Sequence, residues 1–344
     1  MKAIKFFAIS AMAAAMITSC SSEDELSQSN YPSDNIIRVT AGVNNAKTRA
    51  EGQGTPLEKP LSLTVVNKNE NATLAKKYTY VNKVFTKDDN GAWNCSETLL
   101  WQKDTQPVDI VAFAPAPNGK FNGVYAEGST QPIQSITYSV ADDQSTSSDN
   151  NDLLYYYAKD FKPGTSLVDK KLSIQFNHAF CMIDINVTLG TEFNKPNVLK
   201  ESPIVKVTLG GTKIAANVDV TKAASVVTVS ETDAPTTITT TKGSFTPAEN
   251  ADKKADPEKN AISRFSCIAI PQTVGANTFK VSLMTADKLY EWTSDKEITL
   301  QSGYRYTLNL SMGNDVVLLK GGSDNGGITA TPWGNGTGGS LETD

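Results

Sequence analysis

Apolar and polar positions alternate with a period of two over most of the chain after residue 50, and the apolar stretches are short. The stretch 172–178, for example, places Leu172, Ile174 and Phe176 on one face and polar residues on the other. Turn residues separate these stretches, and helical periodicity is hard to find. This pattern predicts an all-β chain built from sandwiches or barrels.

The predicted strands fall into two sets, and 344 residues are enough for two domains of ordinary size. We place the boundary in 159–169, where Pro163 and Gly164 interrupt the pattern, which gives two β-sandwich domains in tandem, 50–168 and 169–313. The first set is 61–66, 78–85, 92–100, 108–113, 133–140 and 153–157; the second is 172–178, 183–189, 205–209, 226–229, 236–241, 265–270, 279–284, 289–292 and 304–310.

The apolar parity changes close to the start of the second set. Phe180 and Met182 continue the face of Phe176, whereas Ile183 and the residues after it alternate on the other face. A β-bulge or a crossing between sheets near 181–183 explains the change. His178 keeps the apolar parity, so we interpret it as a core or interface histidine.

The first twenty residues have the features of an export signal. Lys2 and Lys5 precede an apolar run over 4–17, which is too short to span a bilayer stably. The run ends at 17–20 in Ile-Thr-Ser-Cys, which resembles the lipobox of bacterial lipoproteins. We therefore expect a signal peptide over 1–20 and an acylated Cys20, because several acyl chains on one cysteine anchor a protein stably.

Residues 21–49 read as a tether followed by one strand. An acidic start at 23–25 and a polar stretch precede the β-branched residues of 36–43. The polar, glycine-containing stretch 44–54 comes next, and Arg49 offers a trypsin-like cut before Ala50.

The tail, 314–344, is distinct in composition. A glycine-rich spacer over 321–326 separates two short apolar segments, and the last eleven residues are polar. The positions suited to filling pockets are Val316, Leu318, Ile328, Ala330 and Trp333.

Charge and reactive residues argue against several functions. The formal net charge is −5 and no basic cluster is interleaved with aromatic residues, which argues against nucleic-acid binding. The chain has a single histidine, which argues against most acyl-transfer active sites and most zinc sites, because these use histidine as general base or ligand. We expect no catalytic residues, metal or cofactor. The three cysteines besides Cys20 are far apart, so buried thiols are favoured over a disulfide. Residues 209–213 lack the end of a phosphate-binding loop and are interpreted as a hairpin turn.

Four stretches carry a resemblance to a known family: 108–115, 152–156, 172–179 and the pair 269–273 with 300–306. Together they resemble the fimbrillin-like, or Mfa-like, family of Bacteroidales surface lipoproteins that build type V fimbriae. The resemblance implies two transthyretin-like sandwiches and assembly by strand exchange, in which a trypsin-like protease removes the first strand and a neighbouring subunit supplies another. Here 36–43 matches the removable strand, Arg49 the cut and the tail the donor, although this tail is short and rich in glycine. The acidic run after Cys20 also resembles the sorting signals of surface-exposed lipoproteins in this group.

The leading hypothesis is therefore a structural or tip subunit of a fimbria, held by a lipid anchor in the outer membrane at the cell surface and serving adhesion. Its expected partners are other fimbrial subunits and the processing protease. The alternative is a non-polymerising surface lipoprotein of the same fold that binds glycan or a host ligand, and an enzyme comes third. The sequence leaves open whether the subunit is stalk, tip or anchor, and whether the tail donates a strand or closes its own domain.

Overall fold

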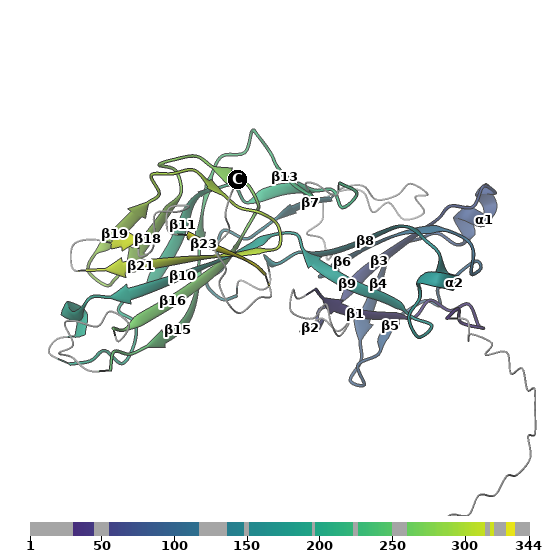
Figure 1. Ribbon diagram of the computed structural model, residues 1–344, viewed down its shortest axis with the longest axis horizontal. Coiled ribbons are helices and arrows are strands. Elements are labelled where there is room, and N and C mark those ends of the chain that lie inside the picture. Colours follow the sequence, from purple (N-terminus) through teal and green to yellow (C-terminus); the bar gives the residue numbers. More distant parts are fainter. Residues whose placement is uncertain are drawn as a thin grey trace, which may run out of the picture.

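The computed structural model describes residues 30–44, 55–116, 136–147, 151–194, 197–222, 226–249, 260–313, 317–319 and 328–333. Strands dominate these residues (Figure 1), and the prediction of an all-β sandwich fold is confirmed. The helices that the structure describes are short: α1 (Ala72–Lys77), α2 (Pro163–Ser166) and a 3-10 turn (Thr191–Asn194). The periodicity did not predict α1, whose first turn is capped by the Asn71 side chain accepting from the Thr73 and Leu74 amides.

The N-terminal part of the molecule is built on eight strands in the order β2-β1-β9-β8-β6-β3-β4-β5. Strands β8 and β9 pair only at Leu154↔His178 and Tyr155↔Asn177, so this ladder joins two layers at one end. The strands are β1 (Val39–Val43), β2 (Thr55–Pro56), β3 (Leu61–Asn67), β4 (Tyr80–Lys87), β5 (Trp93–Cys95), β6 (Val108–Ala114), β8 (Leu154–Phe161) and β9 (Leu172–His178).

The inward residues of both layers form one hydrophobic cluster, which we call the first cluster. Ile174 and Phe176 of β9 are fully buried in it, together with Leu63 of β3 and Ile110 of β6. Period-two alternation produces this arrangement, because every second side chain of each strand faces the opposite layer.

The C-terminal part contains four further sheets around a larger second cluster. Its main sheet has the order β15-β16-β10-β21-β22, with β23 also paired to β21; the others are β14-β11-β18-β19, β13-β12-β7 and β17-β20. The strands are β7 (Ile136–Ser139), β10 (Cys181–Leu189), β11 (Lys206–Thr212), β12 (Ala215–Val218), β13 (Val227–Val229), β14 (Thr236–Thr239), β15 (Thr241–Thr246), β16 (Ile262–Ala269), β17 (Thr273–Val274), β18 (Lys280–Met284), β19 (Leu289–Thr293), β20 (Ile298–Thr299), β21 (Tyr304–Met312), β22 (Val317–Leu319) and β23 (Ile328–Pro332).

The two clusters share strands. On β6, Ile110 and Ala112 belong to the first cluster, whereas Val111 and Phe113 on the opposite face belong to the second. Strand β7 follows β6 in sequence but pairs with β12 of the C-terminal part. The two parts are therefore joined by packing as well as by the chain.

Strand membership differs from the sequence-based division at two places. Strand β9, expected to open the second sandwich, lies in the first cluster because it pairs with β1. Strand β7, assigned to the first set, contributes Ile136 and Tyr138 to the second cluster. The boundary at 168/169 and the count of two tandem domains stay predictions, and this pairing would move the boundary beyond His178.

The expected crossing between sheets is present, just before the predicted residues. Strand β9 ends at His178 and β10 begins at Cys181 in a different sheet, with Ala179 and Phe180 fully buried between them. The glycines of 209–213, by contrast, lie inside β11 and not in a hairpin turn. Gly211 has φ +90° at a register shift, and a Cβ there would come within 2.2 Å of the Thr278 carbonyl oxygen.

Candidate functional site

Strand β1, the core of the predicted removable segment, occupies the middle of a three-strand layer. It pairs antiparallel with β2 at Gly42↔Pro56 and parallel with β9 from Val39↔Leu172 to Val43↔Phe176. Ile37 and Val39 are buried in the first cluster, with exposed fractions of 4% and 5%. The sequence 36–43 therefore forms a strand over most of its length, with Ile36 in an isolated bridge to Leu100.

The segment around β1 is also bound by backbone hydrogen bonds. The Leu172 amide donates to the Arg38 carbonyl at 2.7 Å, and the Asn44 amide donates to the Phe176 carbonyl at 2.7 Å. On the other flank, the Ile37 amide donates to the Leu99 carbonyl at 2.8 Å. The exposed Arg38 guanidinium forms an ion pair with Asp34 and holds the pKa of that carboxyl well below its usual range.

Strand β9 depends on β1 for most of its pairing. Its residues 172–176 pair with β1, while its pairs with β8 involve only Asn177 and His178. Among the described residues, no other strand pairs with 172–176. Loss of β1 would leave these backbone groups without a strand partner and would open the apolar space that Ile37 and Val39 fill.

The predicted processing site lies in the connection between β1 and β2. Arg49 and Ala50 fall within residues 45–54, which lie outside the described residues. The predicted lipidation site Cys20 and the donor candidate Val316 lie outside them too. The flanking strands are described, and they place the two ends of this connection at the paired residues Val43 and Thr55. A cut within it would leave β1 attached to the following chain only by non-covalent contacts.

The tail lies along the edge of its own sheet in this structure. Strand β22 pairs with one end of β21 at Met312↔Val317, and β23 pairs with the other end from Tyr304↔Pro332 to Leu308↔Ile328. Of the donor candidates, Ile328 and Ala330 are buried in the second cluster, each 4% exposed. Leu318 is 59% exposed, and Trp333 packs against the cluster.

Trp333 and His178 connect the tail to β9. Their rings stack with centroids 3.8 Å apart and an interplanar angle of 5°. The His178 Nδ1 lies 2.9 Å from Asp152 Oδ2, and the side chains of His178 and Asp152 are 11% and 12% exposed. His178 is thus an interface histidine, as its parity indicated, but its contact with the tail could not be read from sequence.

Gly303 holds the end of the tail in place. Its carbonyl accepts the Trp333 amide at 2.7 Å, and its own amide donates to the Phe180 carbonyl at 2.9 Å. Its φ of +73° is the left-handed conformation that glycine adopts without strain. One turn residue therefore connects the tail to the crossing between the two clusters.

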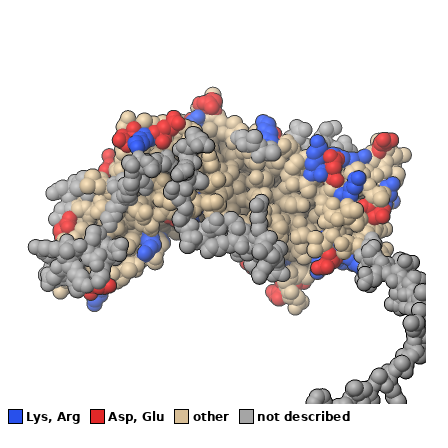
Figure 2. Space-filling view, viewed as in Figure 1, with Lys and Arg blue, Asp and Glu red and all other residues tan. Residues whose placement is uncertain are grey.

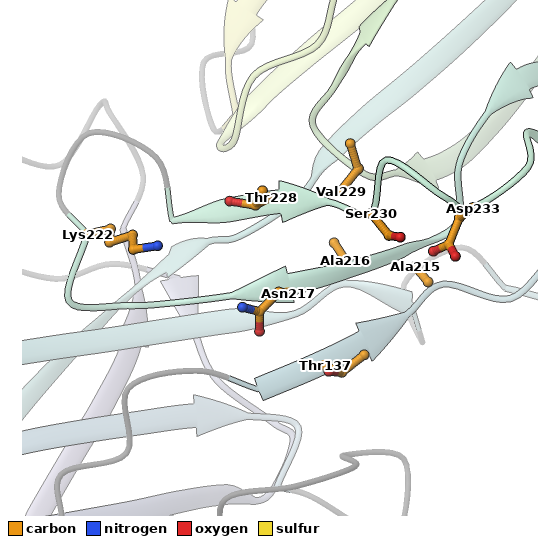
Figure 3. Close-up of a pocket in the computed structure, with 9 residues that line it drawn as sticks. All are labelled: Thr137, Ala215, Ala216, Asn217, Lys222, Thr228, Val229, Ser230 and Asp233. Atoms are coloured by element: carbon orange, nitrogen blue, oxygen red, sulfur yellow. The ribbon is translucent and has the colours of Figure 1, made fainter.

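A separate groove with a mixed polar and apolar lining lies on the sheet β13-β12-β7 (Figure 3). It has a volume of about 280 Å³. Sequence reasoning missed it because Thr137 on β7 is far in the chain from the other lining residues, and no local pattern predicts that β7 pairs with β12. The lining is mixed in character and consists of Thr137, Ala215, Ala216, Asn217, Lys222, Thr228, Val229, Ser230 and Asp233. Figure 3 shows the Lys222 side chain toward one end of it and the Asp233 side chain toward the other, with Asn217 between them. Such hydroxyl, amide and charged groups suit a polar ligand.

The described surface has neither a patch of one charge on the face shown in Figure 2 nor a group of metal ligands. On the face shown in Figure 2, basic and acidic side chains are mixed near both ends of the molecule. Within the described ranges, no three His, Cys, Asp or Glu residues are grouped as metal ligands would be. The same residues contain no helix long and apolar enough to cross a membrane.

The motif 108–115 has a structural explanation. Asp109 on β6 is 7% exposed, and its Oδ1 lies 2.8 Å from Lys68 Nζ. The same oxygen accepts the Asp160 amide at 2.9 Å, where β8 passes β6 with a register shift. This carboxylate therefore connects β6 to β8 and to the residue that follows β3.

Solved structures with the same fold come from Bacteroides. A candidate cell adhesion protein from Bacteroides ovatus is 16% identical, with a TM-score of 0.58, covering 87% of this chain and 97% of that chain. A second from Bacteroides uniformis is 15% identical, with a TM-score of 0.54, covering 87% and 100%. A fimbrial protein from Bacteroides vulgatus is 14% identical, with a TM-score of 0.52, covering 86% and 99%.

The comparison with curated proteins finds no match. The family comparison finds one: residues 48–333 match the fimbrillin-like family. The matched residues are most of the chain and include β2 through β23 and Trp333. The resemblance drawn from four stretches is thereby confirmed. The chain belongs to the fimbrillin-like family.

Proposed function

We propose that this chain is a subunit of a cell-surface fimbria, exported as a lipoprotein through Cys20, cut after Arg49 and joined to its neighbours by strand exchange in the service of adhesion. Membership of the fimbrillin-like family supports the fimbrial role. The observation that carries the exchange mechanism is that β1 alone pairs with residues 172–176 of β9, among the residues described.

The energetic argument follows from that pairing. A cut after Arg49 makes β1 a separate peptide, which can dissociate. Its departure leaves buried backbone groups of β9 without partners, and each unsatisfied buried group costs about 1–3 kcal/mol. The cleaved subunit is then stable only when another strand occupies the groove, which is the basis of assembly by strand addition.

The test is cleavage of the purified precursor by a trypsin-like protease that is specific for arginine, because a cut after Lys47 would also separate β1 from the following chain. We expect a new N-terminus at Ala50 and multimers that migrate as a ladder. Arg49→Ala should leave monomers, whereas Lys47→Ala, at the other basic residue of the 45–54 connection, should behave as the unmodified chain does. Cleavage at Arg49 without any multimer would argue for a tip role, and resistance of Arg49 in the cell and in solution would overturn the mechanism.

Lipid anchoring is tested separately at the signal. Cys20→Ala should release the protein from the membrane fraction or leave the signal uncut, because the thiol that carries the lipid is gone. Radiolabelled fatty acid should enter the unmodified chain and not the variant. Unchanged membrane partition with normal signal removal would contradict the proposal.

The groove on β13-β12-β7 supports a second candidate function, that of a surface lipoprotein that binds a glycan or a host ligand without polymerising. Its hydroxyl and amide groups are suited to sugar hydroxyls. Binding to a glycan array that Asn217→Ala abolishes, in a chain that never forms multimers, would favour this alternative. Loss of multimers in Arg49→Ala together with intact glycan binding would show that the two functions coexist.

A further inference from the structure

Three polar side chains lie in one row across the sheet β13-β12-β7. Asn217 of β12 pairs with Thr228 of β13 on one side and with Thr137 of β7 on the other. Residues paired directly across antiparallel strands point to the same face of the sheet. Because neighbouring strands are about 4.8 Å apart, the row offers a hydroxyl or an amide roughly every 4.8 Å.

The row is exposed and its polar groups are available to a ligand. All three side chains lie at the surface, and none of them hydrogen-bonds to another part of the described chain. The opposite face of the same strands is buried in the second cluster through Ile136, Tyr138, Ala216, Val218 and Val227. The row is therefore held in place by packing before any ligand arrives, as is usual for a small-molecule site.

Ala215 forms an apolar floor beside the row. It lies two residues before Asn217 on the same strand, so both side chains face the groove. Its methyl group is shorter than the threonine and asparagine side chains, which leaves a shallow space above it. A sugar ring suits such a space, because hydroxyl groups surround its rim and C–H groups cover its faces. The volume of about 280 Å³ is close to the lower limit of about 300 Å³ for small-molecule sites, so the part of the ligand that it holds is small.

Opposite charges mark the two ends of the groove. Figure 3 shows Lys222 toward one end and Asp233 toward the other. The Lys222 Nζ lies 3.7 Å from Asp219 Oδ2, beyond hydrogen-bond distance, and the Lys222 side chain is 63% exposed. The ammonium group therefore keeps its donors for a ligand anion, whereas the Asp233 carboxylate accepts from donors such as sugar hydroxyls.

An extended peptide is a poorer match to this surface. Peptides that join a sheet do so along an unpaired strand edge, through main-chain hydrogen bonds. The groove lies on the face of the sheet, where side chains and not main-chain groups meet the ligand. Its lining residues also include no Trp, Tyr or Arg, the residues that contribute most to binding between proteins.

We infer that the groove on β13-β12-β7 binds a carboxylated sugar, with the carboxylate at Lys222 and the hydroxyls along the row and at Asp233. The inference rests on the glycan-binding function proposed above for this groove. It adds the acidic class of the sugar and the direction in which the sugar lies. It does not depend on strand exchange, so a chain that polymerises and one that does not would bind the same ligand.

Matched pairs of sugars test the charge. The purified precursor is titrated with sialyllactose and with trigalacturonic acid, each beside its methyl ester, which keeps the ring and removes the negative charge. We expect each acid to bind about 10-fold more tightly than its ester, because the carboxylate gains a charge-assisted hydrogen bond from Lys222. This advantage should shrink in high salt. The two acids distinguish a nonulosonic acid from a uronic acid as the preferred ligand.

Variants of the lining residues test the place of binding. Lys222→Ala should weaken binding of the acids about 10-fold and leave binding of the esters unchanged, whereas Lys222→Arg should retain both. Lys280→Ala, at an exposed lysine of another sheet, is the matched control. Thr137→Val removes a hydroxyl and keeps the shape of the side chain, so it should weaken acids and esters alike. Thr293→Val on β19 is its control and should change neither. All of these positions are exposed, and circular dichroism checks that the fold is kept.

Several outcomes overturn the inference. Equal binding of acids and esters would leave a glycan site but exclude the acidic class. Unchanged binding in Lys222→Ala or in Thr137→Val would place the ligand elsewhere, and no binding of either acid at millimolar concentration would exclude the site. Tighter binding of peptides with a free C-terminal carboxylate would replace the sugar by a peptide. The cleavage test measures the fimbrial proposal separately, because the Lys222→Ala chain should still form the ladder when it is cut.

Discussion

Tyr138 shows how one side chain from the first half of the chain stabilises the second cluster. It lies on β7, is 2% exposed and has its ring centroid 5.3 Å from that of Phe180. Burial, with a smaller contribution from the charge of Asp152, raises the pKa of Tyr138 to about 12. The neutral phenol is thus strongly favoured in the folded state.

This raised pKa predicts a loss of stability in alkaline solution. The contribution of Tyr138 is fully present below the ordinary tyrosine pKa of 10 and is lost as the pH rises toward about 12, because only the unfolded chain ionises in that window. The loss from this residue should be roughly 3 kcal/mol once the pH passes the folded-state pKa. Urea denaturation between pH 9 and 12 should show a smaller pH dependence for Tyr138→Phe. An identical loss in the variant would contradict the prediction.

The cysteines should differ in reactivity according to their burial. Cys181 and Cys267 are buried, and burial raises the pKa of both thiols above its usual range; the Cys181 thiol also donates to the Ala269 carbonyl at 3.2 Å. Cys95 is only half-buried. A thiol reagent should therefore modify Cys95 in the folded chain and reach Cys181 and Cys267 only after unfolding. Mass spectrometry of labelled peptides measures this, and rapid native labelling of Cys181 would oppose it.

Single residues were predictable where parity alone decides their environment. The burial of Leu172, Ile174 and Phe176 follows from alternation with a period of two. The half-buried state of Cys95 does not follow, because it depends on the position of β5 at the end of a sheet. The stack of Trp333 on His178 depends on how two distant strands meet, which no local pattern encodes.

At the scale of elements, strand positions were easier to predict than strand partners. The predicted 61–66 and 108–113 agree closely with β3 and β6, since both are short stretches of mostly apolar and β-branched residues between turn residues. The pairing of β9 with β1 was missed, because a parallel partner more than a hundred residues away leaves no signal in either sequence. Helix α1 was missed because it buries no residue and so shows no apolar periodicity.

The end of the tail should be loosened by removal of one ring. Trp333→Ala deletes the stack on His178 and leaves the backbone bonds of β23 to β21 in place. An aromatic pair contributes about 0.5–1.5 kcal/mol beyond its burial, so amide exchange in 328–332 should accelerate roughly 2- to 10-fold. Trp333→Phe should retain most of the protection. Equal exchange in all three chains would show that the stack contributes nothing.

At the scale of the whole molecule, the sequence indicated two domains with a simple border. The structure shows two clusters that share β6, and β7, from the first half of the chain, belongs to the second cluster. Alternation identifies which face of a strand is apolar but not which of two cores that face meets. Strand β6 illustrates this, since its continuous run from Val108 to Ala114 is buried on both faces.

Shared strands predict cooperative unfolding. Val111 and Phe113 connect the second cluster to a strand whose other face fills the first, so unfolding either cluster disrupts the other. Calorimetry of the uncut chain should show one transition with matching calorimetric and van't Hoff enthalpies. The chain cut within 45–54 and freed of β1 should melt at a lower temperature. Two well-separated transitions in the uncut chain would contradict this view.

The two residues between β9 and β10 have a mechanical consequence. These residues do not form a flexible surface linker, because Ala179 and Phe180 are both fully buried. The Ala179 amide also donates to the Leu153 carbonyl at 2.8 Å. Tension applied to one end of a subunit would pass to the other end through close-packed side chains and not through a hinge. In the assembly proposed above, a filament of such subunits should bend at the joints between copies and stay stiff within each copy, so the joints would set its persistence length.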